Sequence, residues 1–533
     1  MRFFSKAASL FSSSRLPVTG LGLGAMVALA AIGNGRAQLA ARPPTADAVT
    51  VLLDDTKTYQ TIDNFSASDA WACQFVGLWP AAKKEAIADL LFSTEAGPGG
   101  QPKGIGLSMW RFNIGAGSAQ QGEQSGILDE WHRAESFLTP TGEYDWSRQA
   151  GQQWFLQAAK QRGVTKFLGF LNSPPVQYTV TGRAFAAGGK TNIAPARYAD
   201  MATYIANVVQ GVGRRTGITF DYLSPVNEPQ WDWSDPKQEG SPFRNEEIAG
   251  VAKALNASLT TRHLPTRILI PEAGKITYLT GPDDKPSQGD QVRAFFDPAA
   301  PTFVGSLPRL APVVAGHSYF TTSPYPQAVA ARQQLAARVA AVKGLSFWQS
   351  EYCILGDNGG EINGDRRDLG MAPALYLART IHSDLASTNA AAWQWWLALS
   401  PYDYKDGLIY IDKTKGDGQY YPSKMLWALG NYSRFVRPGA MRIEVRTPDA
   451  GPNPELLVSA YKNAGGKQLV VVIVNSGTAP ARVQLALPKQ KLGVVRSFTT
   501  SATADLQPGP VAKAGQPVLV APRSVTTLLG DLR

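Results

Sequence analysis

Segments typical of buried strands alternate with segments of helical spacing along most of this chain, and this alternation limits the fold more than any other feature. Short runs rich in β-branched and aromatic residues predict strands, and apolar residues three or four apart predict helices. The predicted strands are 62–69, 105–114, 165–172, 218–223, 267–272, 312–317, 345–351 and 390–396. The predicted helices are 81–91, 147–161, 197–212, 246–260, 328–342 and 372–385. Eight strands alternating with helices indicate an α/β fold of the (β/α)8, or TIM barrel, type.

The pattern changes past Arg434, where strands follow one another without helices. Gly, Pro, Asn and Ser separate these strands, which predicts a C-terminal all-β sandwich side domain. Its predicted strands are 455–461, 468–475, 481–487, 493–498 and 518–529. We therefore expect the barrel over 61–431 and the sandwich over 432–533. The segment 38–60 contains a linker and a strand that belongs to no strand and helix pair, and we expect this strand to join the β-domain.

The first 37 residues have the features of a secretory signal peptide. A basic start precedes an apolar run over 16–32, and Gly35-Arg-Ala37 provides small residues for cleavage after Ala37. An uncleaved N-terminal anchor is the alternative, although the run is short for a membrane span. We expect a secreted or extracytoplasmic protein whose mature form does not enter a membrane.

Charge and histidine content narrow the functional classes. The chain has 52 Lys and Arg against 42 Asp and Glu, but four of the excess positive charges lie in the leader, which leaves about +6 on the mature chain. Basic residues are scattered, so nucleic-acid binding is not expected. The four His do not cluster, and hydrogen bonding or packing suits His317 better than metal ligation. We expect a monomer with no cofactor and no metal.

Cys73 and Cys353 are the two cysteines of the chain. In an exported protein they could form one disulfide, because both follow predicted strand ends on the same face of the barrel. Two separate buried thiols are the equal alternative, and the spacing does not choose between them.

Two glutamates stand where barrel enzymes hold their catalytic groups. Glu228 lies in Ser224–Trp233 (SPVNEPQWDW), after a strand that prolines terminate, and Glu351 ends the strand 345–351. The C-terminal ends of barrel strands form the catalytic face. Glycoside hydrolysis uses a proton donor and a second carboxylate on either side of the bond, and a gap of about 5–5.5 Å gives retention of configuration. We predict a retaining glycosidase, with Glu228 as acid/base and Glu351 as nucleophile.

Each of these residues also has a structural interpretation. A single glutamate at a loop start is more often a helix cap or an ion-pair partner, but two at the ends of the fourth and seventh strands reverse that preference. Glu272 also ends a strand, yet it lacks aromatic neighbours, so we expect structural pairing or a secondary substrate contact. The tryptophans near these glutamates could be core residues. Their position beside polar groups instead favours platforms for sugar rings, which predicts substrate contacts for Trp231, Trp233, Trp395 and Trp396.

Several motifs together resemble glycoside hydrolase family 30, most of all its endo-β-1,6-galactanase-like branch. They are SPVNEPQWDW, Gln238-Glu-Gly240, WQSEY at 348–352 and WQWWLALSPYDYKDGLIY at 393–410. The resemblance implies the barrel with its side β-domain, Glu228 as acid/base and Glu351 as nucleophile. It also implies sugar-lining roles for five residues, which are Arg111, Asn227, His317, Tyr319 and Trp395.

Within this resemblance, Asn227 is the expected partner of the substrate's 2-hydroxyl. Arg111 and a hydrogen bond from Tyr319 are expected to keep Glu351 ionised. Relatives elsewhere in the family often carry an acid shortly after the second strand, whereas this chain has Gly115-Ala-Gly-Ser-Ala-Gln there. That departure argues against glucosylceramide or glucuronoxylan specificity.

Two functional classes follow from these residues. The first is a secreted retaining endo-glycosidase for β-1,6-linked galactan, such as arabinogalactan side chains, with another β-linked glycan as the alternative. The second is a sugar-binding protein on an inactive hydrolase scaffold. The presence of both carboxylates favours the enzyme, because a binding protein does not need the pair.

Overall fold

The structure is a computed structural model that describes residues 48–447, 454–488, 490–513 and 515–533. The predicted signal peptide and its cleavage site after Ala37 lie outside these residues. Within the described ranges, no helix has both the length and the apolar composition that crossing a bilayer requires.

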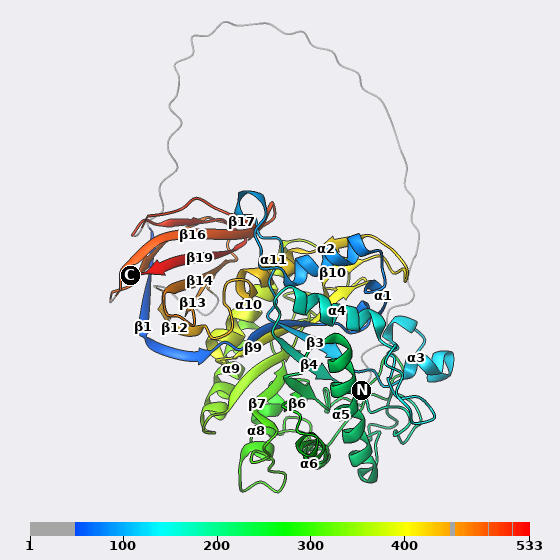
Figure 1. The fold of residues 1–533 in the computed structure, drawn as a ribbon. Helices are drawn as coiled ribbons and strands as arrows, with labels where there is room; N and C mark the ends of the chain where they lie inside the picture. Colours follow the sequence, from blue (N-terminus) through cyan, green and yellow to red (C-terminus); the bar gives the residue numbers. More distant parts are fainter. Residues whose placement is uncertain (1–47, 448–453, 489, 514) are drawn as a thin grey trace, which may run out of the picture. The chain divides into compact units, whose positions relative to one another are not determined.

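Eight parallel strands form a closed barrel, which confirms the predicted (β/α)8 fold (Figure 1). Each strand pairs with the next one along the chain, and β9 also pairs with β8 and β2, which closes the sheet. The strands are β2 (Asn64–Ser68), β3 (Met109–Asn113), β4 (Lys166–Phe170), β5 (Tyr222–Ser224), β6 (Arg267–Ala273), β7 (Leu310–His317), β8 (Ser346–Glu351) and β9 (Ala392–Ser400). Two further strands, β10 (Gly407–Ile411) and β11 (Tyr420–Pro422), extend the sheet beyond β9.

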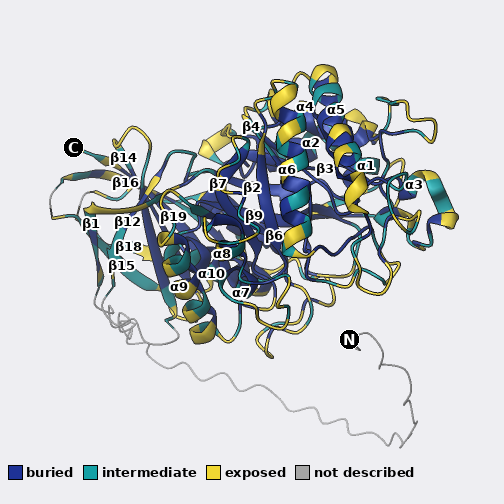
Figure 2. Ribbon diagram, turned by 90° about the horizontal axis from the view of Figure 1, so that it is seen from below, coloured by how far each residue is buried: buried dark blue, intermediate teal, exposed yellow. Residues whose placement is uncertain are grey.

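Helices connect the barrel strands, and each buries one face. In α5 the buried residues Met201, Ile205, Val208 and Val212 are three or four positions apart, which places them on a single stripe. Figure 2 shows the exposed faces of the helices turned away from the buried strands. The longer helices are α2 (Ala81–Phe92), α4 (Ala150–Gln161), α5 (Tyr198–Thr216), α6 (Asn245–Thr261), α9 (Tyr325–Ala340), α10 (Met371–Ser387) and α11 (Lys424–Ser433).

The C-terminal strands and β1 (Val49–Thr61) form one mixed sheet of nine strands. β1 pairs antiparallel with β12 and parallel with β15, so the N-terminal strand is part of the β-domain. One apolar cluster includes residues from both ends of the sheet order, such as Val495 and Val520, so the sheet folds over a shared core as a sandwich does. The other strands are β12 (Met441–Arg446), β13 (Leu456–Lys462), β14 (Gln468–Asn475), β15 (Ala481–Ala486), β16 (Leu492–Ser501), β17 (Ala504–Pro508), β18 (Val518–Val520) and β19 (Ser524–Leu532).

Strand β14 is buried on both faces because it lies between two cores. Leu469, Val471 and Ile473 point into the core of the β-domain, whereas Val470 and Val472 belong to the core that continues into the barrel. This alternation follows from the two-residue period of a strand. The side chain of Asn431 in α11 strengthens the contact by donating hydrogen bonds to the Phe498 carbonyl and the Thr527 hydroxyl, both at 3.0 Å.

Several predicted elements differ from the observed ones. The strand predicted over 218–223 is observed only as β5, because the Asp221 carboxylate accepts the Phe167 N–H at 2.9 Å, in place of a strand carbonyl. The strand predicted over 518–529 is two strands, β18 and β19, because the chain turns between them at Arg523, which has φ 45°. Helix α11 runs through the predicted boundary at 431 and ends at Ser433.

Candidate active site

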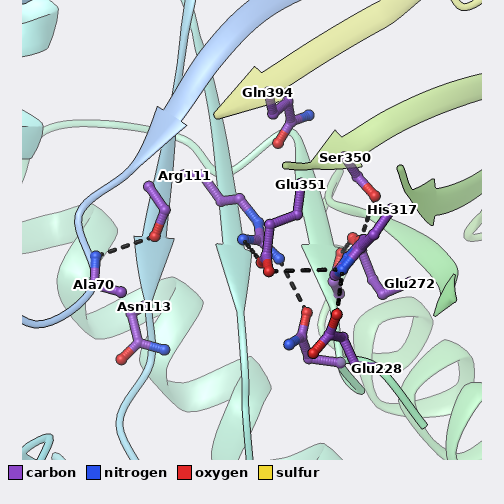
Figure 3. A network of polar contacts seen from close by, with 12 residues as sticks. Ala70, Arg111, Asn113, Glu228, Glu272, His317, Ser350, Glu351 and Gln394 are labelled. Carbon is purple, nitrogen blue, oxygen red and sulfur yellow. Dashed lines mark hydrogen bonds and ion pairs between the residues drawn. The ribbon is translucent and has the colours of Figure 1, made fainter. Parts of the chain in front are cut away.

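The C-terminal ends of the barrel strands bring the predicted site residues together (Figure 3). Glu351 is the last residue of β8, His317 is the last residue of β7, and Arg111 lies in β3. Glu228 follows β5 by four residues, in the loop that Pro225 and Pro229 keep out of regular structure. All four side chains are nearly or fully buried, so charges here interact in a medium of low polarity.

Glu351 is held by two donors from other strands. Nη1 of Arg111 lies 2.5 Å from Oε2 of Glu351, and the Tyr319 hydroxyl donates to Oε1 at 3.1 Å. Burial raises the pKa of Glu351 above its ordinary value, and the charge of Glu228 adds to this effect, while the charges of His317 and Arg111 act in the opposite direction. Arg111 also donates to the side-chain oxygen of Asn227 at 3.2 Å. These contacts fix the orientation of the Glu351 carboxylate.

The main chain at Glu228 is tightly fixed. Its N–H donates to the Glu272 carbonyl at 2.9 Å, and its own carbonyl accepts from the Trp233 indole at 3.0 Å. Glu228 has φ 44°, a left-handed conformation that costs free energy for a residue with a side chain. The surrounding hydrogen bonds hold this strained conformation, which aims the carboxylate toward His317 and Glu351.

His317 bridges the glutamates and has no exposed surface. Its Nδ1 lies 3.0 Å from Oε1 of Glu228 and 3.6 Å from Oε1 of Glu351, and its Nε2 lies 3.1 Å from Oε2 of Glu272. Burial by itself would lower the pKa of His317, but the charge of Glu351 and the hydrogen bonds with Glu228 and Glu272 raise this pKa to about 10. The ring is therefore a cation at neutral pH.

The contacts of both ring nitrogens of His317 with carboxylates fit a metal site poorly. A carboxylate oxygen each of Glu228 and Glu351 and a ring nitrogen of His317 lie within 4.8 Å of one another, a spacing that could suit a metal ion. However, a metal-binding imidazole must offer an unprotonated nitrogen, whereas both nitrogens of His317 face carboxylates. The donor set fits a hydrogen-bonded cation better than a metal ligand.

Glu272 is a third buried carboxylate, which the sequence pattern assigned to structural pairing or secondary substrate contact. It is fully buried and accepts hydrogen bonds from the hydroxyls of Ser224 and Ser350, both at 2.5 Å, and contacts His317. Burial would raise the pKa of Glu272, but the hydrogen bond from His317 and the charge of Arg111 lower it to about 2. Glu272 is thus a permanent anion that stands behind His317. Its position at a strand end was the only sequence signal for this contact.

Asp69 is a buried acid that the sequence patterns did not single out. It directly follows β2 and accepts from the Asn113 N–H at 2.7 Å and from Gln152 at 3.1 Å. Burial raises the pKa of Asp69 to about 8, and both hydrogen bonds act against this rise. The position of Asp69 immediately after a barrel strand was the signal that could have identified it.

The tryptophans predicted to bind sugar have different environments. Trp231 and Trp233 are half-buried beside Glu228, and the Trp233 indole N–H donates a hydrogen bond to the Glu228 carbonyl. Trp396 is 7% exposed. Trp395 has no exposed surface and donates to the Asp406 carbonyl at 2.7 Å. The substrate contact of Trp395 stays a prediction, since Arg111 and His317 likewise have no exposed surface.

Cys73 and Cys353 are separate buried thiols, so the disulfide alternative is not realised in the structure. Each sulfur has different neighbours. The Cys353 sulfur lies 3.7 Å from the Tyr319 hydroxyl oxygen, whereas Cys73 begins the short helix α1 (Cys73–Val76) near Asp69. Burial raises the pKa of both thiols well above the ordinary value, which makes them poor nucleophiles at neutral pH.

The motif Gln238-Glu-Gly240 anchors a loop beside the site. The buried carboxylate of Glu239 accepts hydrogen bonds from the N–H of Ala116 at 2.9 Å and from the hydroxyl of Ser118 at 2.6 Å. It thereby fixes the segment 115–120 after β3, which contains no acidic residue. Burial raises the pKa of Glu239 to about 7, although these hydrogen bonds favour its ionised form.

Carboxylate oxygens of Glu228 and Glu351 lie within 4.8 Å of each other. This separation is closer to the about 5–5.5 Å of retaining enzymes than to the about 6.5–9.5 Å of inverting ones, and it suits direct attack by one carboxylate. A (β/α)8 barrel with two such carboxylates at its C-terminal face defines the class of retaining glycoside hydrolases. Residues 48–410 match O-Glycosyl hydrolase family 30. The chain belongs to this family and is a retaining O-glycosyl hydrolase.

Similar proteins in this family differ in their named activities. The chain is 25% identical to an endo-beta-1,6-galactanase of Hypocrea rufa over 449 residues, which covers 81% of this chain and 82% of the relative. It is 26% identical to glucuronoxylanase XynC of Bacillus subtilis, which covers 66% of this chain and 70% of the relative. Among solved structures, a conserved exported protein from Bacteroides fragilis is 33% identical, with a TM-score of 0.83, and covers 90% of this chain and 100% of that one.

Proposed function

We propose that this protein is a secreted endo-β-1,6-galactanase that acts on galactan or arabinogalactan side chains, with Glu228 as acid/base and Glu351 as nucleophile. The observation that carries the catalytic part is the approach of their carboxylates within 4.8 Å. The galactan assignment is supported by the similarity to a named endo-beta-1,6-galactanase over most of both chains. Another β-linked glycan is the second candidate, because the chain is also similar to a glucuronoxylanase.

The first half-reaction breaks the glycosidic bond. Protonated Glu228 gives its proton to the glycosidic oxygen, while the ionised Glu351 attacks the anomeric carbon and forms a glycosyl ester. In the second half-reaction, Glu228 takes a proton from water as that water attacks the same carbon. Two displacements at one carbon retain its configuration. Asn227 is positioned to hydrogen-bond the sugar hydroxyl beside that carbon.

His317 faces the negative charge of the buried cluster on both sides of the first step. The mechanism requires a protonated Glu228 and an ionised Glu351 before attack, beside the cation His317 and the anion Glu272. After attack, Glu351 is a neutral ester and Glu228 is an anion, so the negative charge has moved between two groups that both face Nδ1 of His317. Because the same cation faces both positions, the charge shift requires no new counter-ion in a site of low polarity.

Secretion rests on two observations. The first 37 residues have a signal-peptide pattern, and a similar solved protein is named as exported. A mature N-terminus at Gln38, read by mass spectrometry of the secreted protein, is the expected result. A retained Met1 on the exported protein would favour the uncleaved anchor instead.

The substrate is tested by following the digestion of de-arabinosylated β-1,6-galactan by NMR, with the leaderless protein. We expect short oligosaccharides whose new reducing ends first appear as the β-anomer. Early α-anomer would contradict the nucleophile role of Glu351. Cleavage of β-1,4-xylan or β-1,6-glucan with no cleavage of galactan would contradict the substrate assignment, and no cleavage of any β-glycan would favour a sugar-binding protein.

A further inference from the structure

Two groups of aromatic side chains occupy opposite halves of the barrel mouth. Around the closed barrel, β9, β2 and β3 are neighbours, and so are β5, β6 and β7; β4 and β8 separate the two sets. The first set and its loops carry the Trp71 cluster, which consists of Trp71, His132, Trp396 and Tyr402. The loops after the second set carry the Phe320 cluster, which consists of Trp231, Tyr278 and Phe320.

The Trp71 cluster is built around one indole ring. Trp71 packs against His132 with ring centres 3.9 Å apart and the ring planes tilted by 31°, and it meets Trp396 edge-on at 5.3 Å. Tyr402 packs at the edge of Trp71, and its hydroxyl donates to Asp129 at 2.9 Å. Trp71 has φ 63°, a strained conformation that such packing must maintain. Its indole remains partly exposed.

The Phe320 cluster forms a corner beside Glu228. The rings of Trp231 and Phe320 are nearly perpendicular, at 86°, with centres 5.9 Å apart. Phe320 is 56% exposed and has φ 58°, so a strained backbone presents a large apolar ring to solvent. Gly274 makes room for Trp231, because a Cβ there would lie 2.7 Å from the indole nitrogen. An exposed aromatic side chain that is held at a cost in strain suggests a binding role.

The two clusters lie beside different glutamates. Trp231 lies three residues after Glu228, and its backbone N–H donates to the Glu228 carbonyl at 3.2 Å. The Phe320 cluster therefore adjoins the group that protonates the leaving sugar. Trp396 packs on Phe170 at 6.3 Å, and the Arg111 guanidinium covers that same ring at 3.7 Å. The Trp71 cluster therefore adjoins the side on which Arg111 orients the nucleophile.

We propose that the carbohydrate chain crosses the barrel mouth between these clusters, with the leaving-group sugar on Trp231 and Phe320 and the sugars on the other side of the cleaved bond on Trp71. This inference rests on the proposed glycosidase function and adds the direction in which the chain binds. Aromatic faces on both sides of the cleaved bond bind interior segments of a chain, which explains cleavage within the chain rather than from one end.

The charged groups beside both clusters are already engaged in ion pairs. Lys413 lies 2.7 Å from Asp129 next to Tyr402, and Lys275 lies 3.0 Å from Asp283 next to Tyr278. These two cations are therefore balanced by local carboxylates instead of being left for an acidic sugar. The clusters suit neutral sugar units, whose apolar ring faces stack on aromatic side chains.

The test maps where hexasaccharides labelled at the reducing end are cut by wild type, Phe320→Ala and Trp71→Ala. The labelled product contains the sugars on the leaving-group side. Loss of Phe320 should favour binding with fewer sugars there and so give shorter labelled products, whereas loss of Trp71 should give longer ones. Each variant should lower kcat/KM on the hexasaccharide by about tenfold, the loss expected for one aromatic binding contact, and Phe320→Tyr should restore the pattern.

Tyr59→Ala is the matched control, because Tyr59 is an exposed aromatic residue on β1 of the β-domain; it should leave the cleavage pattern unchanged. The proposal is overturned if both alanine variants keep the wild-type pattern, if both shift it in the same direction, or if wild type releases only single sugars from one end. The series uses hexasaccharides of β-1,6-galactan, β-1,6-glucan and β-1,4-xylan. Cleavage of glucan or xylan alone would refute the galactan assignment and leave the direction of shift as the test, while cleavage of none would overturn both proposals.

Discussion

Glu351 is subject to two opposing influences that together set its ionisation. Burial raises its pKa, while the cations His317 and Arg111 lower it, and the net pKa is above the ordinary 4.5. Ionised Glu351 is the proposed nucleophile, so protonation at low pH removes the attacking group. Because the pKa is raised, this loss begins at a higher pH than for an ordinary glutamate.

The pH dependence of kcat/KM should therefore have an acid limb that falls as the pH decreases through a value above 4.5. This limb reports the pKa of the essential group in the enzyme without bound substrate. It can be measured with a soluble oligosaccharide over pH 3–8, with the stability of the enzyme checked at each pH. An acid limb below pH 4 would contradict the raised pKa of Glu351.

Replacing Arg111 separates the effect of its charge from that of its contacts. Arg111→Gln removes a cation that lowers the pKa of Glu351, so the acid limb should move up by about 1–2 pH units. Arg111→Lys keeps the charge and is the control, with a smaller shift. An acid limb that stays in place in Arg111→Gln would show that the ion pair does not set the ionisation of Glu351.

Single residues also show how far the sequence could identify this site. Glu228 and Glu351 were located because each follows a strand at the catalytic end of a barrel, and the structure brings them together. The sequence could not predict which tryptophans of β9 reach the barrel mouth, because only the register of this strand decides it; Trp395 is fully buried, whereas Trp396 is 7% exposed. Phe320 follows Tyr319 in the sequence, and nothing in its local pattern indicated exposure.

At the scale of elements, Glu272 at the C-terminal end of β6 ties together four neighbouring strands. Its carboxylate contacts Ser224 of β5, His317 of β7 and Ser350 of β8. The sequence predicted each of these strands from its apolar run. It could not predict this link, because the three partners lie 45 to 78 positions from Glu272 in the sequence. Contacts between barrel strands follow from closure of the sheet rather than from local composition.

Glu272→Gln should lower the free energy of unfolding by about 3 kcal/mol at pH 7, because a buried ion pair with His317 loses its anion. The pKa of Glu272 is lowered to about 2 in the folded protein, so its contribution is complete above the ordinary value of 4.5 and is lost as the pH falls toward 2. The difference between wild type and variant, measured by chemical denaturation, should shrink between pH 5 and pH 3.

Ser350→Ala is the control for this measurement, since it removes one hydrogen bond to Glu272 and leaves the charge. Its cost should be about 1 kcal/mol and should depend less on pH. An equal loss at pH 7 and pH 3 for Glu272→Gln would contradict the ionised state assigned to Glu272.

At the scale of the whole molecule, the barrel and the β-domain share a continuous core. One face of β14, with Val470 and Val472, packs into the core that continues into the barrel. The other face, with Leu469 and Val471, packs into the core of the β-domain. The sequence pattern predicted the β-domain and the separate strand within 38–60, near the start of the chain. The helix α11 and its bonds to β16 and β19 were not predicted, because a short apolar helix before a strand-rich segment carries no signal of its partner.

This shared core predicts that the barrel and the β-domain unfold together. Calorimetry should give one transition for residues 46–533, because separating the domains would expose the apolar face of β14. Asn431→Ala should lower the midpoint of that single transition, since it leaves buried partners on β16 and β19 unsatisfied. Two well-separated transitions in the wild-type protein would contradict this coupling.

The central claim is that Glu351 forms a covalent bond to the sugar, and trapping this intermediate tests it most directly. A 2-deoxy-2-fluoroglycosyl fluoride of the sugar that the enzyme cleaves slows both half-reactions, because fluorine destabilises the positive charge of the transition state. We predict that the mass of the intact protein increases by one sugar unit and that peptide sequencing by mass spectrometry places the sugar on Glu351. A label on Glu228 or Glu272, or inactivation without a label, would contradict the mechanism.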